Sequence, residues 1–269
     1  MKPLTEGPQR IVCLTEETTE TLYLLGEQQR IVGISGFTVR PPQARKEKPK
    51  VSAFTSAKID KILALEPDLV LGFSDMQADI AAQLIRAGVA VHVFNQRTVT
   101  GIFEMMQMVG TLAGAAAKAE ALITELNEGL QAIEQSVAQL QHKPRVYFEE
   151  WNEPLISAIG WVSELIGIAG GEDCFAELGR ESAAKNRIIA DPEEVIRRAP
   201  DIIIGSWCGK HFRPEQLCER PGWAEIPAVC NGHLYEIKSC DILQPGPAAL
   251  TDGVRQIHAI VQRWAQSQC

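Results

Sequence analysis

The sequence predicts an α/β protein with two similar lobes, each built on a parallel sheet, joined by a single long helix. Strand and helix signals alternate in both halves of the 269-residue chain. One motif, a helix end followed by Pro-Asp and a buried strand, occurs twice, as "ALEPDLVLGFS" and "RRAPDIIIGSW". Between the halves lies a stretch with neither proline nor strand signals. Strands separated by helical crossovers pair in parallel, which gives the fold class.

The first lobe is assigned to residues 1–101. "RIVCLT" and "RIVGIS" are short runs of β-formers, and "IDKILALEPDLVLGF" combines a short helix with a strand. Pro67 cannot continue that helix and therefore marks the switch to the strand. "ADIAAQLIRAGVAVHVF" adds another helix, a stop at Gly88 and another strand.

A bridging helical segment is assigned to residues 102–143. Its apolar residues recur at spacings of three and four, which is typical of one buried helix face. These residues are Leu122, Leu126, Leu130, Ile133, Val137 and Leu140. We therefore expect a rigid helix between the lobes.

The second lobe is assigned to residues 144–269, where "RVYFEEW" and "HLYEIKS" are strand signals. "DPEEVIRRAPDIIIGSW" predicts a helix capped by Asp191, with Pro192 at its first position, and then a strand. The two Pro-Asp motifs are offset by 200 − 67 = 133 residues, and this offset aligns Asp60 with Glu193. An internal repeat explains the alignment, although the motif is also common in unrelated α/β proteins.

Composition excludes several classes of protein. The net charge is −8 and no Lys/Arg cluster contains interleaved aromatic residues, so we expect no nucleic-acid partner. The N-terminal "MKPLTEGPQRIVCL" has no apolar core typical of a signal peptide, and no apolar stretch is long enough for a bilayer. The seven cysteines form no CxxC pair, which favours free thiols in a reducing compartment over a disulfide framework.

No catalytic constellation is evident. The sequence has no GxSxG, no P-loop and no GxGxxG after a strand, and its histidines are scattered. The weak alternatives are a metal site at Cys208 and His211, a Cys208 nucleophile with His211, or a hydrolase that uses Glu149 and Glu150. We therefore expect no enzyme activity, no metal site and no catalytic cofactor.

Motifs along nearly the whole chain resemble one family. They include "RIVCLTEETTETLYLLG", "FTVRPPQA", "KIDKILALEPDLVL", "IGIAGGEDCF", "DPEEVIRRAPDIII" and "RPGWAEIPAVCNGHLYEI". The set resembles substrate-binding proteins of the helical-backbone class, which serve ABC importers, and most of all the cobalamin and iron-siderophore binders. The resemblance implies two Rossmann-like lobes with parallel sheets, bridged by one rigid helix, with the ligand in the cleft between them.

The resemblance also implies a function. It predicts a monomer that holds a cobalamin-like corrinoid or another metal chelate and delivers it to an ABC permease. A cytoplasmic ligand-binding or sensing protein descended from that family is the alternative. The family implies a periplasmic or membrane-tethered location, whereas the missing signal peptide implies a cytoplasmic one if the chain is full length.

Two acidic residues match the family's permease-docking positions. They are Asp60 and Glu193, the pair that the internal repeat aligns. A carboxylate suits pairing with permease arginines. Each also fits an ordinary acid in the first turn of a helix, where the macrodipole favours negative charge.

Ligand-contact candidates follow the predicted strand ends, where open α/β lobes bind ligands. In the first lobe they are Glu16, Glu17, Phe37, Arg40, Phe54 and Phe73. In the second they are Glu149, Glu150, Trp151, Trp161, Trp207, Lys210 and Gln244.

The candidates differ in character. The three phenylalanines match aromatic positions of B12-binding relatives and suit a flat ligand, with core packing as the alternative. Trp151 and Trp207 each follow a strand among polar neighbours, which favours a pocket rim over a core. Arg40, Glu149, Glu150 and Lys210 give more charge than a corrinoid needs and favour a charged ligand or a metal chelate. Alternatively, Glu149 and Lys210 pair with each other.

Overall fold

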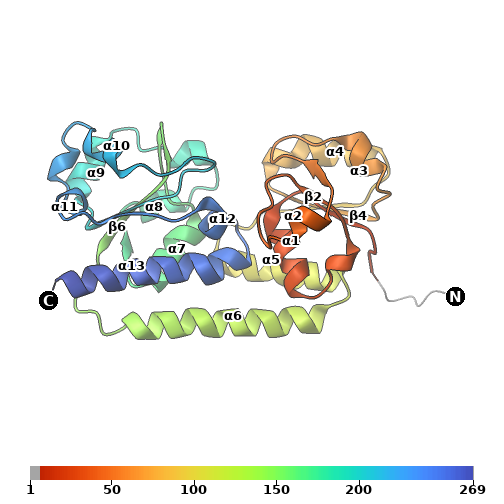
Figure 1. Ribbon diagram of the computed structural model, residues 1–269, viewed down its shortest axis with the longest axis horizontal. Helices are drawn as coiled ribbons and strands as arrows, with labels where there is room; N and C mark the ends of the chain where they lie inside the picture. Colours follow the sequence, from red (N-terminus) through yellow and green to blue (C-terminus); the bar gives the residue numbers. More distant parts are fainter. Residues whose placement is uncertain (1–6, 269) are drawn as a thin grey trace. The chain divides into compact units, whose positions relative to one another are not determined.

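The computed structural model describes residues 7–268, which divide into two compact units (Figure 1). The first unit contains the residues up to 96 and residues 100–126, and the second contains 97–99 and the residues from 127 onward. Both units are α/β, which confirms the predicted fold class.

The first unit is built on a parallel five-stranded sheet in the order β3-β2-β1-β4-β5. The strands are β1 (Ile11–Cys13), β2 (Ile31–Ser35), β3 (Lys50–Ser52), β4 (Leu69–Phe73) and β5 (Val91–Phe94). The connecting helices are α1 (Glu16–Leu24), α2 (Ala44–Glu47), α3 (Ile59–Leu63) and α4 (Ala78–Arg86). Val12, Val70 and Ile62 are buried together in the core between sheet and helices. Because all five strands run parallel, the loops after them share one edge of the sheet.

The helical middle contains two helices rather than one. These are α5 (Val99–Leu112) and α6 (Ala116–Val137). Gly114 lies in the left-handed region at φ 69°, and the amide of Ala115 donates to the carbonyl of Gly110, which is a Schellman ending for α5. The helix that carries the chain from residue 126 of the first unit to residue 127 of the second is α6.

The second unit has a mixed sheet with the path β10-β9-β6-β7, and β8 also pairs with β6. Its strands are β6 (Arg145–Asn152), β7 (Leu155–Ser157), β8 (Glu172–Asp173), β9 (Ile202–Gly205) and β10 (Leu234–Glu236). The prediction of a purely parallel sheet is wrong here, since β7 runs antiparallel to β6. Only Glu153 and Pro154 connect these strands, and so short a connection permits only a hairpin.

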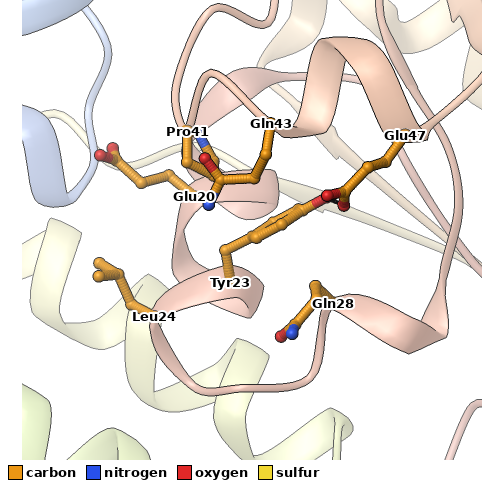
Figure 2. A pocket seen from close by; sticks show the side chains of 7 residues that line it. All are labelled: Glu20, Tyr23, Leu24, Gln28, Pro41, Gln43 and Glu47. Atoms are coloured by element: carbon orange, nitrogen blue, oxygen red, sulfur yellow. Dashed lines mark hydrogen bonds between the residues drawn. The ribbon is translucent and has the colours of Figure 1, made fainter.

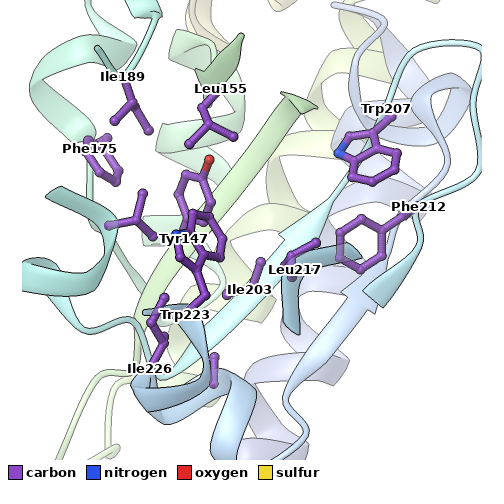
Figure 3. Close-up of a cluster of buried hydrophobic side chains, with 12 residues drawn as sticks. Tyr147, Leu155, Phe175, Ile189, Ile203, Trp207, Phe212, Leu217, Trp223 and Ile226 are labelled. Atoms are coloured by element: carbon purple, nitrogen blue, oxygen red, sulfur yellow. The ribbon is translucent and has the colours of Figure 1, made fainter. Parts of the chain in front are cut away.

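Helices surround this second sheet. They are α7 (Gly160–Ile168), α8 (Ala176–Gly179), α9 (Glu193–Arg198), α10 (Pro214–Cys218), α11 (Pro227–Cys230), α12 (Ser239–Ile242) and α13 (Val254–Ser267), with a π-helical turn at Ala249–Gly253. An aromatic cluster fills the core on one side of the sheet (Figure 3). In it, the ring of Tyr147 lies edge-on to Phe175 at 5.6 Å and to Trp223 at 6.1 Å between centroids.

The repeated Pro-Asp motif forms the same structure twice. Glu66 and Ala199, which precede the two prolines, both have left-handed backbones, at φ 47° and 43°. Asp68 accepts from the amide of Arg10 at 2.9 Å, just before β1, and Asp201 accepts from the amide of Arg145 at 2.8 Å, where β6 begins. In each unit, a carboxylate therefore ties the Pro-Asp strand to the first strand of the sheet.

Two other sequence features are visible in the structure. No helix within residues 7–268 is both long and apolar enough to cross a bilayer. The six cysteines in the described range, Cys13, Cys174, Cys208, Cys218, Cys230 and Cys240, all have free thiols, while Cys269 lies outside that range.

Candidate functional site

The ligand-contact candidates of the first unit lie in or beside the loops after β1 to β4. Phe37, after β2, is exposed over 67% of its surface, and Phe54, after β3, is half-buried. Phe73 is buried at the end of β4, so it packs in the core, as the alternative interpretation held. The buried side chain of Gln77 accepts from the amide of Phe73 at 2.9 Å and donates to the carbonyl of Phe54 at 2.9 Å. This amide therefore joins two of the loops.

Buried carboxylates lie at the start of α1, directly after β1. Glu16 is 4% exposed and Glu17 is 1% exposed. One oxygen of Glu16 accepts from the amides of Val39 and Arg40, and one of Glu17 accepts from the Thr15 hydroxyl at 2.6 Å. The second oxygen of each has no hydrogen-bond partner among the described residues. Loss of hydration on burial raises the pKa of each carboxyl to about 7, against the lowering effect of these hydrogen bonds.

Arg40, another ligand-contact candidate, is held within the first unit. Its Nε lies 3.0 Å from a carboxylate oxygen of Glu20, one turn further along α1 from Glu16. Glu20 also lines a cavity of about 320 Å³, together with Tyr23, Leu24, Gln28, Pro41, Gln43 and Glu47. Figure 2 shows the ring of Tyr23 pointing toward Glu47, whose carboxylate accepts from the phenol at 2.8 Å. Sequence reasoning did not predict this cavity.

In the second unit, Glu149 is fully buried and saturated with donors. One oxygen accepts from the Trp207 indole at 2.9 Å and from Arg220 at 3.0 Å. The other accepts from Arg220 at 2.6 Å and from the Tyr147 hydroxyl at 3.1 Å. The predicted alternative of a Glu149–Lys210 pair is wrong, because the forked guanidinium of Arg220 satisfies both oxygens.

The rim location favoured for Trp207 is also wrong. Its side chain is only 3% exposed and packs edge-on against Phe212 at 5.2 Å between ring centroids (Figure 3). Trp161 is buried as well, and its indole donates to the carbonyl of Ile242 at 2.9 Å. A buried indole needs a hydrogen-bond acceptor, and the fold supplies one in each case. Ligand contact by these residues stays a prediction.

Trp151 and Glu150 lie at the carboxyl end of β6 with part of their surface exposed. The Lys210 ammonium lies 4.2 Å from the Trp151 ring centroid, a cation–π contact. Glu150 receives two hydrogen bonds from buried Arg187, at 2.6 and 3.0 Å. Gln244 is half-buried in the loop after α12. Sequence reasoning missed Arg187 and Arg220, because no local pattern marks them.

The two docking candidates occupy matching positions in their units. Asp60 lies in the first turn of α3 and Glu193 in the first turn of α9, and both are exposed. As predicted, Asp191 caps α9 by accepting from the amide of Glu193 at 3.0 Å. Glu193 also lines a cavity of about 750 Å³ within the second unit, whose wall includes Arg220 and Trp223.

The catalytic and metal alternatives gain no support from the geometry. Cys208 is an exposed residue, yet partial desolvation of its thiol and the nearby Glu150 carboxylate raise the pKa of that thiol, which opposes formation of a thiolate nucleophile. Glu149 has its lone pairs directed at protein donors and is shielded from solvent. Within residues 7–268, no group of three or more His, Cys, Asp or Glu side chains is arranged to hold a metal ion.

Comparison with known proteins defines the class. Residues 11–240 match the family described as periplasmic binding protein, and the chain therefore belongs to that family. A substrate-binding lipoprotein of an ABC transporter from Bacillus subtilis is 24% identical over 259 residues, which cover 93% of this chain and 79% of that protein. A vitamin B12-binding protein of Vibrio parahaemolyticus is 26% identical over 248 residues, covering 91% of this chain and 86% of that protein.

A solved structure is similar over nearly the full length. The periplasmic haem-binding protein of Roseiflexus sp. RS-1, in its apo form, matches with a TM-score of 0.79 and 24% identity, covering 95% of this chain and all of that one. This likeness concerns the fold, and these relatives are binding proteins rather than enzymes.

Proposed function

We propose that the chain is the substrate-binding protein of an ABC importer and that it holds a cobalamin-like corrinoid or a similar planar metal chelate. The observation that carries the proposal is the exposure of aromatic surface at strand ends. Phe37 does this in the first unit and Trp151 in the second. Aromatic faces of this kind suit a flat macrocycle.

The ion pairs favour a ligand of low charge. Three of the four charges that seemed excessive for a corrinoid are neutralised within the protein, because Arg40 pairs with Glu20, Glu149 with Arg220 and Glu150 with Arg187. The fourth, Lys210, lies against the Trp151 ring. The charged-ligand interpretation thus loses its main support, and the relatives named for vitamin B12 and cobalamin binding point in the same direction.

The importer role rests on the exposed acids Asp60 and Glu193. Both lie in helix first turns of a repeated motif, and Glu193 has only a loose contact of 3.7 Å with Arg197. An exposed carboxylate with so weak an internal partner is suited to an arginine of a permease.

Charge reversal tests the importer role. In a strain that depends on this protein for corrinoid uptake, Asp60→Arg and Glu193→Arg should abolish uptake, while cyanocobalamin affinity stays within twofold of the parent chain. Asp79→Arg, an exposed reversal on α4, serves as the control and should leave uptake intact. Normal uptake with both docking reversals would contradict permease docking through these two acids. Corrinoid uptake that survives deletion of this protein would contradict the importer role and favour the cytoplasmic sensor.

The ligand is tested by native mass spectrometry of protein purified from its own cells, with an absorption spectrum of the same sample. A co-purified corrinoid, visible by mass and by colour, is the expected result. A bound haem would instead assign the chain to the activity named for its structural neighbour.

A further inference from the structure

The loop from Gly36 to Arg40, here called the Phe37 loop, combines a rigid backbone with an exposed aromatic side chain. Each of its five backbone amides donates a hydrogen bond. Gly36 donates to Ser52, Phe37 and Thr38 donate to Ser35, and Val39 and Arg40 donate to Glu16. The carbonyls of Gly36 and Thr38 accept from Arg45 at 2.8 and 3.1 Å.

The same loop leaves apolar surface in water. Phe37 is 67% exposed and Val39 is 38% exposed, although a buried phenylalanine side chain is worth about 1.5–3 kcal/mol. A loop that is fixed at every amide and yet leaves its aromatic ring exposed is preorganised to place that ring against something else. Preorganisation raises affinity because the ordering entropy is lost in folding rather than in binding.

The carboxylate of Glu16 is the main anchor of this loop. One oxygen of Glu16 accepts from the amides of Val39 and Arg40, the last two amides of the loop. Glu16 itself belongs to a different element, the first turn of α1. Glu16 is 4% exposed and therefore is not itself presented to a ligand. Glu20, from the same helix, holds the side chain of Arg40.

We propose that Glu16 is a positioning residue that fixes the Phe37 loop so that the Phe37 ring stacks on the face of a planar metal macrocycle. The proposal rests on the function proposed above for the ligand, and it gives Glu16 a role different from the direct ligand contact expected from the sequence. Arg45 assists from α2 by holding the two carbonyls.

A double-mutant cycle with dicyanocobinamide as the probe tests the proposal. Phe37→Ala should weaken binding about tenfold or more, as expected for a lost aromatic anchor. Glu16→Ala should cause a loss of similar order, because the loop must then be ordered on binding. In the Phe37→Ala background, Glu16→Ala should add less than a twofold loss. Additive losses would overturn the proposal, because a merely structural role does not depend on Phe37.

A conservative variant of Glu16 tests whether this residue acts by positioning the loop or through its negative charge. In Glu16→Gln the amide oxygen can still accept from Val39 and Arg40, so affinity should stay within about twofold of the parent chain. Arg45→Ala loosens the loop from the other side without altering α1 and should reproduce part of the Glu16→Ala loss. Glu120→Ala, an exposed change on α6, is the matched control. A Glu16→Gln variant as weak as Glu16→Ala contradicts the positioning role.

Hydrogen exchange keeps this inference separate from the proposed function. The amides of Val39 and Arg40 should be protected in the parent chain and in Glu16→Gln, and should exchange at least tenfold faster in Glu16→Ala. If the parent chain binds no corrinoid, the ligand assignment fails, while exchange still decides whether Glu16 fixes the loop. Unchanged protection in Glu16→Ala would overturn the positioning role whatever the ligand is.

Discussion

The two units bury carboxylates near their strand ends in opposite ways. In the second unit, Glu149 receives four hydrogen bonds, two of them from Arg220. In the first unit, Glu16 and Glu17 each have one oxygen without a partner in the described part of the chain, and the hydrogen bonds to their other oxygens come from neutral donors.

The carboxylate of Glu149 belongs to an ion pair with Arg220, whereas the carboxyls of Glu16 and Glu17 titrate near neutrality. A guanidinium fork offsets the cost of burying Glu149, so that pair is part of the core around Trp207 and Tyr147. Glu16 and Glu17 lack such compensation, and burial raises the pKa of each to about 7. Buried carboxylates near strand ends of two similar lobes thus have different physical roles, and their hydrogen-bond partners decide which role each has.

The largest expected effect comes from breaking the buried pair. Glu149→Ala leaves the Arg220 guanidinium without its partner and should lower the free energy of unfolding by about 3–5 kcal/mol. All five tryptophans lie beyond residue 150, so urea unfolding followed by tryptophan fluorescence reports on this unit. Glu153→Ala, at an exposed position of the hairpin, is the control. A loss below about 1 kcal/mol would mean that the Glu149 network is dispensable.

The second prediction concerns pH. The pKa of Glu17 is 4.5 in an unfolded chain and about 7 when folded. The folded state therefore binds more protons between these values, and stability must fall as pH rises through that window. The contribution of Glu17 is roughly 3 kcal/mol, at 1.36 kcal/mol for each pKa unit.

Melting of the parent chain and of Glu17→Gln at pH 5 and pH 8 measures this contribution. Gln cannot ionise, so the variant should gain stability relative to the parent at pH 8 and show little gain at pH 5. Glu120→Gln provides the control for an exposed charge. An equal effect of Glu17→Gln at both pH values would contradict the raised pKa.

A smaller effect tests whether the repeated motif acts equally in both units. Asp68→Ala and Asp201→Ala each remove an acceptor for the amide at the first strand, and each should cost about 1 kcal/mol. Hydrogen exchange at the amides of Arg10 and Arg145 should accelerate in the corresponding variant only. If one of the two substitutions leaves the free energy of unfolding unchanged, the motif has the same geometry in both units but stabilises only one of them.

Much of the fold could be predicted because its signals are local. Pro67 and Pro200 each lie between a helix and the strand that follows it, and the structure confirms that the motif is repeated. The break at Gly114 also has a local cause, since a glycine at that point permits the left-handed helix ending. The sequence interpretation did not consider Gly114, and the regular apolar spacing from Leu122 to Leu140 led to a single expected helix across the bridging segment.

The site was less predictable because its contacts join distant residues. Glu149 selects Arg220, 71 residues away, rather than Lys210, and only the folded sheet brings that guanidinium to it. Trp207 is buried beside the same carboxylate, to which its indole donates at 2.9 Å. By contrast, Phe37 lies two residues after β2 and Trp151 is the second-last residue of β6, so local strand signals were enough to place both near strand ends.

Titration calorimetry of the purified chain with cyanocobalamin tests the central claim most directly. The account predicts one binding site with a dissociation constant in the micromolar range or below, weakened about tenfold or more by Phe37→Ala and by Trp151→Ala. It predicts no such loss for Trp264→Phe, a change in the remote helix α13. Absence of binding, or binding that neither aromatic substitution weakens, would contradict the claim that these strand ends hold a planar metal macrocycle.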